Sequence, residues 1–224
     1  MTTPRDILTD RRRVLTASGA IAIGAVSGCT SLMEVATEER IERQAEPAEI
    51  DEDAVNESGF EEVRSETVVI EEEFEAAGQR REFIAESEVR VYRNRIESEV
   101  IQQEESLVAI VSTPGETVAG QQLSPLANMS EEELIENAQG TAEQEFSGQI
   151  RDPQKVDELT QTVFGEDVDV SVYEITVVSD GVEETGYLHF TLAERGDDVI
   201  LIAGVYPEEA DGERENVMKL FEST

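Results

Sequence analysis

Residues 168–207 read VDVSVYEITVVSDGVEETGYLHFTLAERGDDVILIAGVYP and carry the clearest structural pattern of the chain. Three segments alternate apolar with polar residues or are apolar throughout, as β-strands do: residues 168–178, 182–193 and 199–206. The turn SDG at 179–181 separates the first two segments, and RGDD at 195–198 separates the last two. The stretch therefore predicts a three-strand antiparallel meander that ends at Pro207.

Helices are expected before and after this meander in the sequence, over residues 51–58, 130–139, 152–164 and 213–221. Asp51 can cap the first of them, and Ser130 with Glu133 forms a capping box for the second. Asp152 precedes a proline, which favours a helix start at that point. The third segment also has apolar residues at helical spacing before Gly165: Val156, Leu159 and Val163.

A second antiparallel unit is expected earlier in the chain. The β-rich run at 67–75, a turn at 76–79 and an extended stretch at 81–93 predict a hairpin. Residues 107–112 are apolar and predict a buried strand. Together these segments predict the α+β class: a mainly antiparallel sheet, made of the hairpin plus the C-terminal three-strand meander, with flanking helices.

The composition is strongly acidic, with 52 Asp and Glu against 17 Lys and Arg and a formal net charge of -35. Such a surface repels phosphates, which excludes nucleic acid as a partner. High net charge alone favours disorder, but 38% of the residues are hydrophobic and gather in strand-like runs. A folded domain adapted to very salty water explains both features, because salt screens the self-repulsion. The sequence predicts an extreme halophile, with a generic acidic protein as the alternative.

The amino terminus has the pattern of an export signal. Arg11 and Arg12 precede the apolar residues 14–26, a segment too short to span a membrane and typical of a signal peptide. Paired arginines at this place resemble the twin-arginine export signal. We expect the protein to be exported.

The segment Val26-Ser27-Gly28-Cys29 resembles a lipobox, and Cys29 is the single cysteine of the chain. Its thiol would accept the lipid after cleavage. We therefore expect a signal peptide at 1–28, an acidic tether at 29–45 and one domain at 46–224. The expected location is the outer face of the cytoplasmic membrane, held by one lipid on Cys29. An uncleaved anchor, or a cytoplasmic start with an incidental cysteine, are the alternatives.

Four short motifs resemble a haloarchaeal family of exported lipoproteins of unknown function: Ala48-x-Ile50, ESGF at 57–60, FEAAGQ at 74–79 and GVYP at 204–207. The resemblance spans residues 46–224. The resemblance implies export with a lipid anchor and the extent of the domain, and it implies no activity.

A weaker resemblance concerns the fold only. The apolar strand that stops at Pro207 and the closing helix with Phe221-Glu222-Ser223 are similar to the ends of the photosystem extrinsic subunit and of the Ran-binding nuclear import factor Mog1. This likeness implies a protein-binding module.

Candidate site residues are few. His189 is the one histidine, and its mid-strand position favours a structural, hydrogen-bonded role over a base or ligand. Acidic groups at 51–53, 167–169 and 197–198 could hold a hard cation, but none has the spacing of a calcium loop. The least polar loop, 123–130, is a possible contact surface through four residues: Leu123, Pro125, Leu126 and Met129.

The sequence thus predicts a non-enzymatic, lipid-anchored binding module for an envelope protein or a small ligand, without a cofactor or a metal. Two alternatives remain open. A carboxylate-dependent hydrolase would need a cleft with two acids, one of raised pKa. A hard-cation-binding protein would be stabilised by calcium.

Overall fold

The computed structural model describes residues 40–76, 79–96, 104–115, 117–118, 121–145, 148–179, 182–210 and 212–224, all within the compact unit Leu32–Thr224. In chain order its elements are β1 (Arg40–Gln44), α1 (Glu52–Glu57), β2 (Glu61–Ala76), β3 (Gln79–Ile96), β4 (Glu104–Pro114), β5 (Thr117–Val118), β6 (Gln121–Gln122), α2 (Glu131–Glu145), β7 (Gly148–Val163), β8 (Glu166–Ser179), β9 (Val182–Arg195), β10 (Asp198–Pro207) and α3 (Glu213–Glu222).

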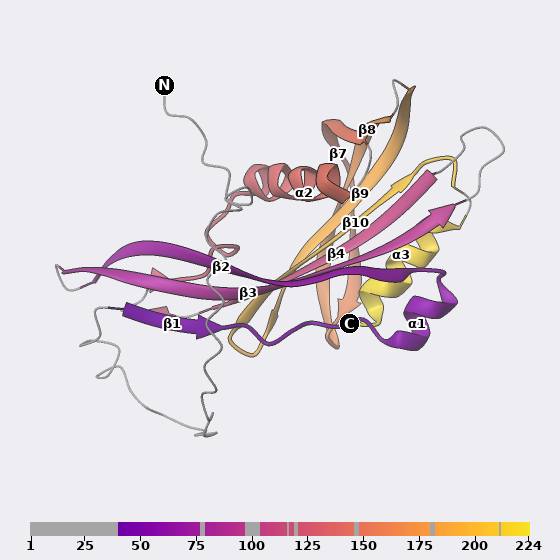
Figure 1. Ribbon diagram of the computed structural model, residues 1–224. Coiled ribbons are helices and arrows are strands. Elements are labelled where there is room, and N and C mark those ends of the chain that lie inside the picture. Colours follow the sequence, from indigo (N-terminus) through magenta and orange to yellow (C-terminus); the bar gives the residue numbers. More distant parts are fainter. Residues whose placement is uncertain are drawn as a thin grey trace. The chain divides into compact units, whose positions relative to one another are not determined.

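One eight-stranded sheet carries the domain, in the order β1-β3-β4-β10-β9-β8-β7, with β2 paired to β3 (Figure 1). β5 and β6 form a separate two-stranded sheet. The expected β2–β3 hairpin and the β8–β9–β10 meander are both present and antiparallel. β3 has three partner strands. β2 pairs along one edge of β3, and the other edge is shared by β1, which pairs with residues 82–86 of β3, and β4, which pairs with residues 88–96 of β3. The β1–β3 pairing is parallel.

The α+β class expected from the sequence is wrong. The structure is 65% strand and 17% helix, so the sheet dominates and the helices are short additions to it. The main error concerns the expected helix at 152–164, because residues 152–163 belong to the long strand β7. β7 pairs with β8 through two register shifts, between Arg151 and Gln154 and between Lys155 and Asp157.

Helices lie on both faces of the sheet. Alternate residues of β10 point to opposite faces. Ile200 and Ile202 belong to a core cluster with Val217 and Phe221 of α3. On the other face, the odd-numbered residues of β10 join Leu134 and Ile135 of α2 in a second cluster. The alternation therefore places α1 and α3 on one face and α2 on the other.

Gly204 allows α3 to approach the sheet closely. A Cβ atom at this position would lie 2.4 Å from Val217 Cγ1 and 3.2 Å from Phe221 Cε2. These two side chains are completely buried. A glycine in β10 therefore makes room for the face of α3 that packs on the strand.

Side chains cap the first two helices as expected. Asp51 accepts hydrogen bonds from the backbone N–H groups of Asp53 and Ala54, at 3.0 and 3.2 Å. Ser130 Oγ accepts from Glu133 N at 3.3 Å, and the Glu133 carboxylate accepts from Ser130 N at 2.8 Å. Both helix starts are confirmed, although α2 continues past the expected end to Glu145.

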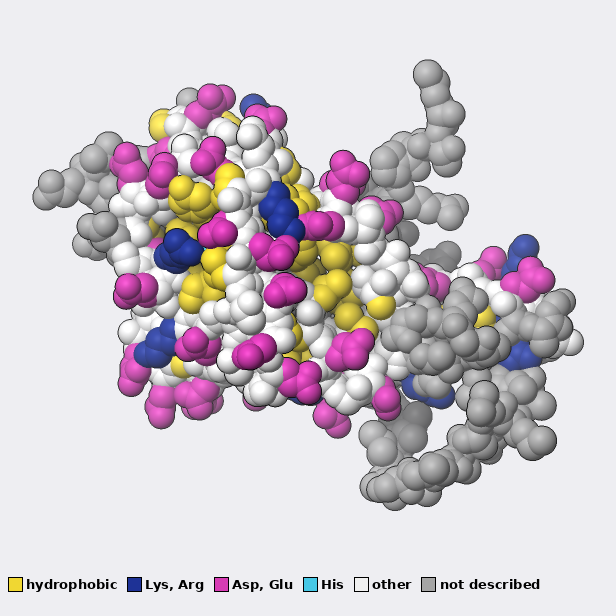
Figure 2. Space-filling view, turned by 180° about the vertical axis from the view of Figure 1, so that it is seen from behind, with side chains coloured by type: hydrophobic (Ala, Val, Ile, Leu, Met, Phe, Trp, Pro, Cys, Tyr) yellow, Lys and Arg dark blue, Asp and Glu magenta, His cyan; other side chains and the backbone are white. Residues whose placement is uncertain are grey.

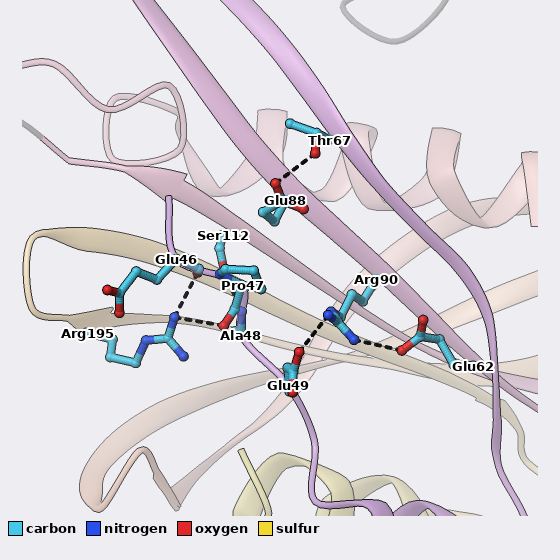
Figure 3. Close-up of polar contacts among 10 residues, drawn as sticks. All are labelled: Glu46, Pro47, Ala48, Glu49, Glu62, Thr67, Glu88, Arg90, Ser112 and Arg195. Carbon is cyan, nitrogen blue, oxygen red and sulfur yellow. Dashed lines mark hydrogen bonds and ion pairs between the residues drawn. The ribbon is translucent and has the colours of Figure 1, made fainter. Parts of the chain in front are cut away.

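A strap, which we define as residues 45–50, crosses from β1 to α1 and is tied to the sheet (Figure 3). Arg195 donates to the carbonyl oxygens of Glu46 and Pro47, at 2.7 and 3.0 Å. Ala48 N donates to Ser112 Oγ at 3.2 Å. Ala45, Ala48 and Ile50 are buried, so the strap is part of the folded domain.

Residues 40–44, assigned to the acidic tether by the sequence pattern, form β1 within the sheet. Ile41 is fully buried and packs with Phe74, Phe83 and Leu123 in a small core cluster under the hairpin. The folded domain therefore includes residues before 46.

Candidate ligand-binding site

The residues expected to direct export and lipidation lie outside the described part of the chain: Arg11, Arg12, Val26, Ser27, Gly28 and Cys29. Within the described ranges, no helix is both long and apolar enough to span a bilayer.

The loop expected to be a contact surface turns most of its apolar residues inward. Leu123 and Leu126 are only 3% and 7% exposed, and Pro125 is buried. Met129 is half-buried and lines a shallow hollow of about 500 Å³ beside Phe190. The loop therefore packs mainly on the core and offers little apolar surface to a partner.

The acidic groups singled out in the sequence have structural partners or stand apart. Asp51 caps α1, Thr162 Oγ1 donates to Asp167, and Asp198 accepts from Glu46 N at 2.7 Å. Burial raises the pKa of Asp198. Among the described residues, no group of three or more His, Cys, Asp or Glu side chains is arranged to hold a metal ion.

A pocket of about 330 Å³ lies at the start of α3, on the face of the sheet that α3 covers. Strands β7, β8, β9 and β10, the segment leading into α3 and the first turn of α3 all contribute to its lining: Val156, Asp157, Val172, Tyr187, His189, Tyr206, Glu208, Ala210, Gly212 and Arg214. Figure 2 shows the molecule from behind, with hydrophobic side chains grouped near the middle of the view and acidic ones spread around them.

The strand register brings the aromatic residues of this pocket together. Tyr187 pairs with Tyr206 across β9 and β10, and their ring centroids are 5.8 Å apart. His189 lies two residues after Tyr187, so both side chains point to the same face of the sheet. The His189 ring centroid is 5.4 Å from that of Tyr206. The three rings form one wall of the pocket.

His189 is completely buried, and its Nε2 lies 2.9 Å from the hydroxyl of Tyr206. Its other nitrogen, Nδ1, has no hydrogen-bond partner among the described residues. Buried polar atoms nearly always have a partner, so an unpaired ring nitrogen in a pocket wall indicates a place for one.

The polar groups of this wall are held in their neutral forms. Burial lowers the pKa of His189 to about 4, helped by the nearby charge of Arg214 and opposed by that of Asp157. Burial also raises the pKa of Tyr206 to about 12. At neutral pH the wall therefore contains a neutral imidazole and a neutral phenol that are hydrogen-bonded to each other, with His189 Nδ1 left without a partner among the described residues.

Charged groups of both signs surround the aromatic wall. Glu208 accepts a hydrogen bond from the Tyr187 hydroxyl at 3.1 Å, which raises the pKa of Tyr187. Asp157 Oδ1 accepts from the backbone N–H of Glu158 at 2.9 Å. Arg214 is exposed and makes no ion pair with any residue that the structure describes. Arg214 is therefore available to a negatively charged group of a ligand.

Of the residues that line this pocket, only His189 was predictable as a candidate from the sequence. Tyr206 and Arg214 join it through the β9–β10 register and the turn before α3. The sequence signal that could have pointed to the pocket is the pair Tyr187 and His189, two polar aromatic residues whose spacing places them on the same face of a strand.

Comparison with known proteins gives a family and no curated relative. No curated protein matches the chain with significance. A family model does match it, over residues 47–224, a range that contains every residue of the pocket. The chain therefore belongs to the family described as Domain of unknown function (DUF6517).

Proposed function

We propose that this protein is a non-enzymatic binding module that holds a small polar ligand in the pocket at the start of α3. The observation that carries the proposal is the fully buried His189, whose Nδ1 is unpaired in the wall of a pocket large enough for a small molecule. A protein ligand at the loop 123–130 has less support, because Leu123, Pro125 and Leu126 are buried.

Carboxylate-dependent hydrolysis is the second candidate, because Asp157 and Glu208 line the same pocket. Binding is preferred over hydrolysis on the use made of these two groups. Each carboxylate is already engaged by a neighbouring donor, Asp157 by Glu158 N and Glu208 by the Tyr187 hydroxyl. The general acid of a hydrolase must instead be free to give a proton to its substrate.

A pocket-blocking variant tests the binding proposal. Val156 lines the pocket and is 52% exposed, so Val156→Phe adds bulk there without overpacking the core. Val69 is 54% exposed on β2, outside the pocket, and Val69→Phe is the matched control. The wild type is screened by thermal shift in molar potassium chloride against amino acids, organic acids, amines, sugars and nucleosides.

At least one compound class should raise the Tm of the wild type and of Val69→Phe, and the rise should be lost in Val156→Phe. Hits that stabilise all three proteins equally would contradict the assignment of the pocket. Turnover of a hit, abolished by Glu208→Gln, would establish the hydrolase instead.

We further propose that the domain is exported by the twin-arginine route and held at the outer face of the cytoplasmic membrane by a lipid on Cys29, in an extreme halophile. The supporting residues are the paired Arg11 and Arg12 and the lipobox Val26-Ser27-Gly28-Cys29. Cys29→Ser should release the protein from the membrane fraction or leave its precursor uncleaved. Unchanged membrane retention and processing would contradict the lipid anchor.

A further inference from the structure

The charges around the pocket indicate which class of small molecule it takes, an inference that rests on the proposed binding function. Arg214 brings one positive charge, and Asp157 and Glu208 bring two negative charges. Although Arg214 shares the pocket with both acids, it forms an ion pair with neither of them. The pocket therefore presents separate positive and negative groups to the same small volume.

We infer that the pocket binds a small zwitterion of the amino-acid or betaine class. Its carboxylate lies against Arg214, where charge-assisted hydrogen bonds are strong. Its ammonium or quaternary ammonium group lies against Glu208 and the ring of Tyr187, which attract a cation by charge and by the ring quadrupole. The pocket volume of about 330 Å³ suits a molecule of this size.

The remaining groups of the wall fit the carboxylate end of such a ligand. When the Tyr206 hydroxyl donates to Nε2 of His189, the neutral ring carries its hydrogen on Nδ1 and can donate it to a ligand oxygen. α3 also begins here, at Glu213, and its N-cap residue is Gly212, which has no side chain to cap the first turn. Backbone N–H groups at a helix start favour negative charge.

Ligands with a single charge fit less well. A simple anion would meet Asp157 and Glu208 and the field of a chain with a net charge of -35. A simple cation would cover Arg214 without giving it a partner, which costs desolvation free energy. A zwitterion has no net charge to be repelled, and it satisfies both signs within the pocket.

Sugars are also disfavoured. Tryptophan, the strongest stacking surface for a sugar ring, is absent from the chain. Tyr206 is buried and its hydroxyl is already engaged by His189.

The test is a calorimetric titration of the full chain in molar potassium chloride. Glycine betaine and L-alanine are the zwitterionic probes, and acetate and tetramethylammonium represent the separate charged ends. Arg214→Gln removes the positive group, and Arg214→Lys is its charge-preserving partner. Glu208→Gln removes a negative group but keeps an acceptor for Tyr187. Arg80→Gln, at a side chain 78% exposed on β3 and outside the pocket, is the control.

At least one zwitterion should bind the wild type about tenfold or more tightly than acetate or tetramethylammonium. Arg214→Gln should weaken that zwitterion by about tenfold and should not weaken tetramethylammonium, which loses a like charge from the pocket. Arg214→Lys should recover part of the loss, and Glu208→Gln should weaken the zwitterion and tetramethylammonium alike. Arg80→Gln should change nothing.

Equal binding of acetate and zwitterion, or of tetramethylammonium and zwitterion, would overturn the zwitterion assignment and leave the pocket as a site for one charge. Binding of other compounds from the wider screen, lost in Val156→Phe while both zwitterions fail, would have the same meaning. If no compound of either set binds, the proposed binding function itself is refuted.

Discussion

Two single residues, His189 and Gly204, set the chemistry and the geometry of the face that α3 covers. They occupy paired positions on β9 and β10. His189 places a neutral ring in the pocket wall, and Gly204 leaves the space that α3 fills. One paired position of β9 and β10 therefore serves two purposes. His189 contributes a buried imidazole to the pocket wall, and Gly204, which has no side chain, lets α3 pack closely beside it.

His189 should make the stability of the protein depend on pH between about 4 and 6.5. Its pKa is about 4 in the folded state and about 6.5 when unfolded, so between these values only the unfolded chain binds the proton. Its stabilising contribution is complete above the unfolded pKa and is lost as the pH falls toward 4. The wild type should lose about 3 kcal/mol more than His189→Gln between pH 7 and pH 4.

Chemical denaturation of both proteins across this pH range, in constant high salt, measures the difference. The many carboxylates titrate in both proteins and cancel in the comparison. Parallel stability curves would show that His189 is accessible to protons in the folded state.

Two glycine-to-alanine substitutions should have opposite effects. Gly204→Ala places a methyl group 2.4 Å from Val217 Cγ1 and should destabilise the protein by about 1–3 kcal/mol. Gly140→Ala lies within α2, where a new methyl group meets nothing within 4 Å, and should stabilise by about 1 kcal/mol. Urea unfolding gives both values. A neutral Gly204→Ala would mean that α3 packs less tightly on β10 than described.

At the scale of elements, the sequence predicted the pieces whose pattern is local. The β2–β3 hairpin, the C-terminal meander and the starts of α1, α2 and α3 are all present. Their patterns are strand alternation, turn residues and capping side chains, which act within a few residues of each other. The parallel pairing of β1 with β3 has no such local pattern, because it joins segments far apart in the chain.

β7 shows why the helix expected at 152–164 was wrong. Two register shifts interrupt the alternation of this strand, so Val156, Leu159 and Val163 acquire a helix-like spacing. Asp152 has a φ of 50°, which makes it part of an irregularity in a strand and not an N-cap. Phe164 and Gly165, with φ of 51° and 80°, form a tight hairpin loop to β8. Residues 148–163 then form a strand because they pair with the edge of β8 that β9 leaves free.

The candidate site likewise depends on pairings between distant segments of the chain. His189 could be singled out as a buried strand residue, but its partners could not be named. Tyr206 contacts it from β10, 17 residues later, and Val156 enters the pocket from a strand that was expected to be a helix. Pockets assembled by register depend on every strand being placed correctly.

β1 should be essential for the stability of the domain even though the family match begins at residue 47. A chain that starts at residue 47 loses the buried Ile41 and leaves the β3 backbone at 82–86 without its parallel partner. We expect a loss of about 2–4 kcal/mol relative to a chain that starts at residue 38, together with self-association through the exposed edge. Thermal unfolding and light scattering in high salt measure both effects.

A matched variant separates burial from backbone pairing. Ile41→Ala in the longer chain removes only the buried side chain and should cost part of the total, without self-association. Equal stability of the two chain lengths would show that β1 adds nothing to the folded domain.

At the scale of the whole molecule, the excess of acid should make folding depend on salt. With a net charge of -35, repulsion is long-ranged in dilute buffer, where the Debye length is about 30 Å at 0.01 M, and short-ranged at about 3 Å in 1 M salt. The ion pairs among described residues lie mainly at exposed positions and offset little of this repulsion. The circular dichroism spectrum should therefore change from folded to unfolded on dialysis from molar to millimolar potassium chloride.

Reducing the charge should shift this transition. Glu132 and Glu136 are exposed one turn apart on α2, where like charges repel. Glu132→Gln with Glu136→Gln should move the folding midpoint to lower salt, whereas sucrose in place of salt should not support folding as well. A native spectrum of the wild type in dilute buffer would contradict the halophilic interpretation.

The parallel pairing of β1, together with the strap, has a mechanical consequence if the chain is anchored through Cys29 as proposed. Force from the membrane would enter the domain at Arg40, the first residue of β1. A pull along the strand would load the five paired positions from Arg40 to Gln44 in shear, all at once, and would not peel them apart one by one. The ties of Arg195 to the carbonyl groups of Glu46 and Pro47 would bear the load next. The attachment point would therefore resist mechanical unfolding. The pocket is lined by β7 to β10, at the opposite end of the strand order from β1, and so lies away from the strands that would bear the force.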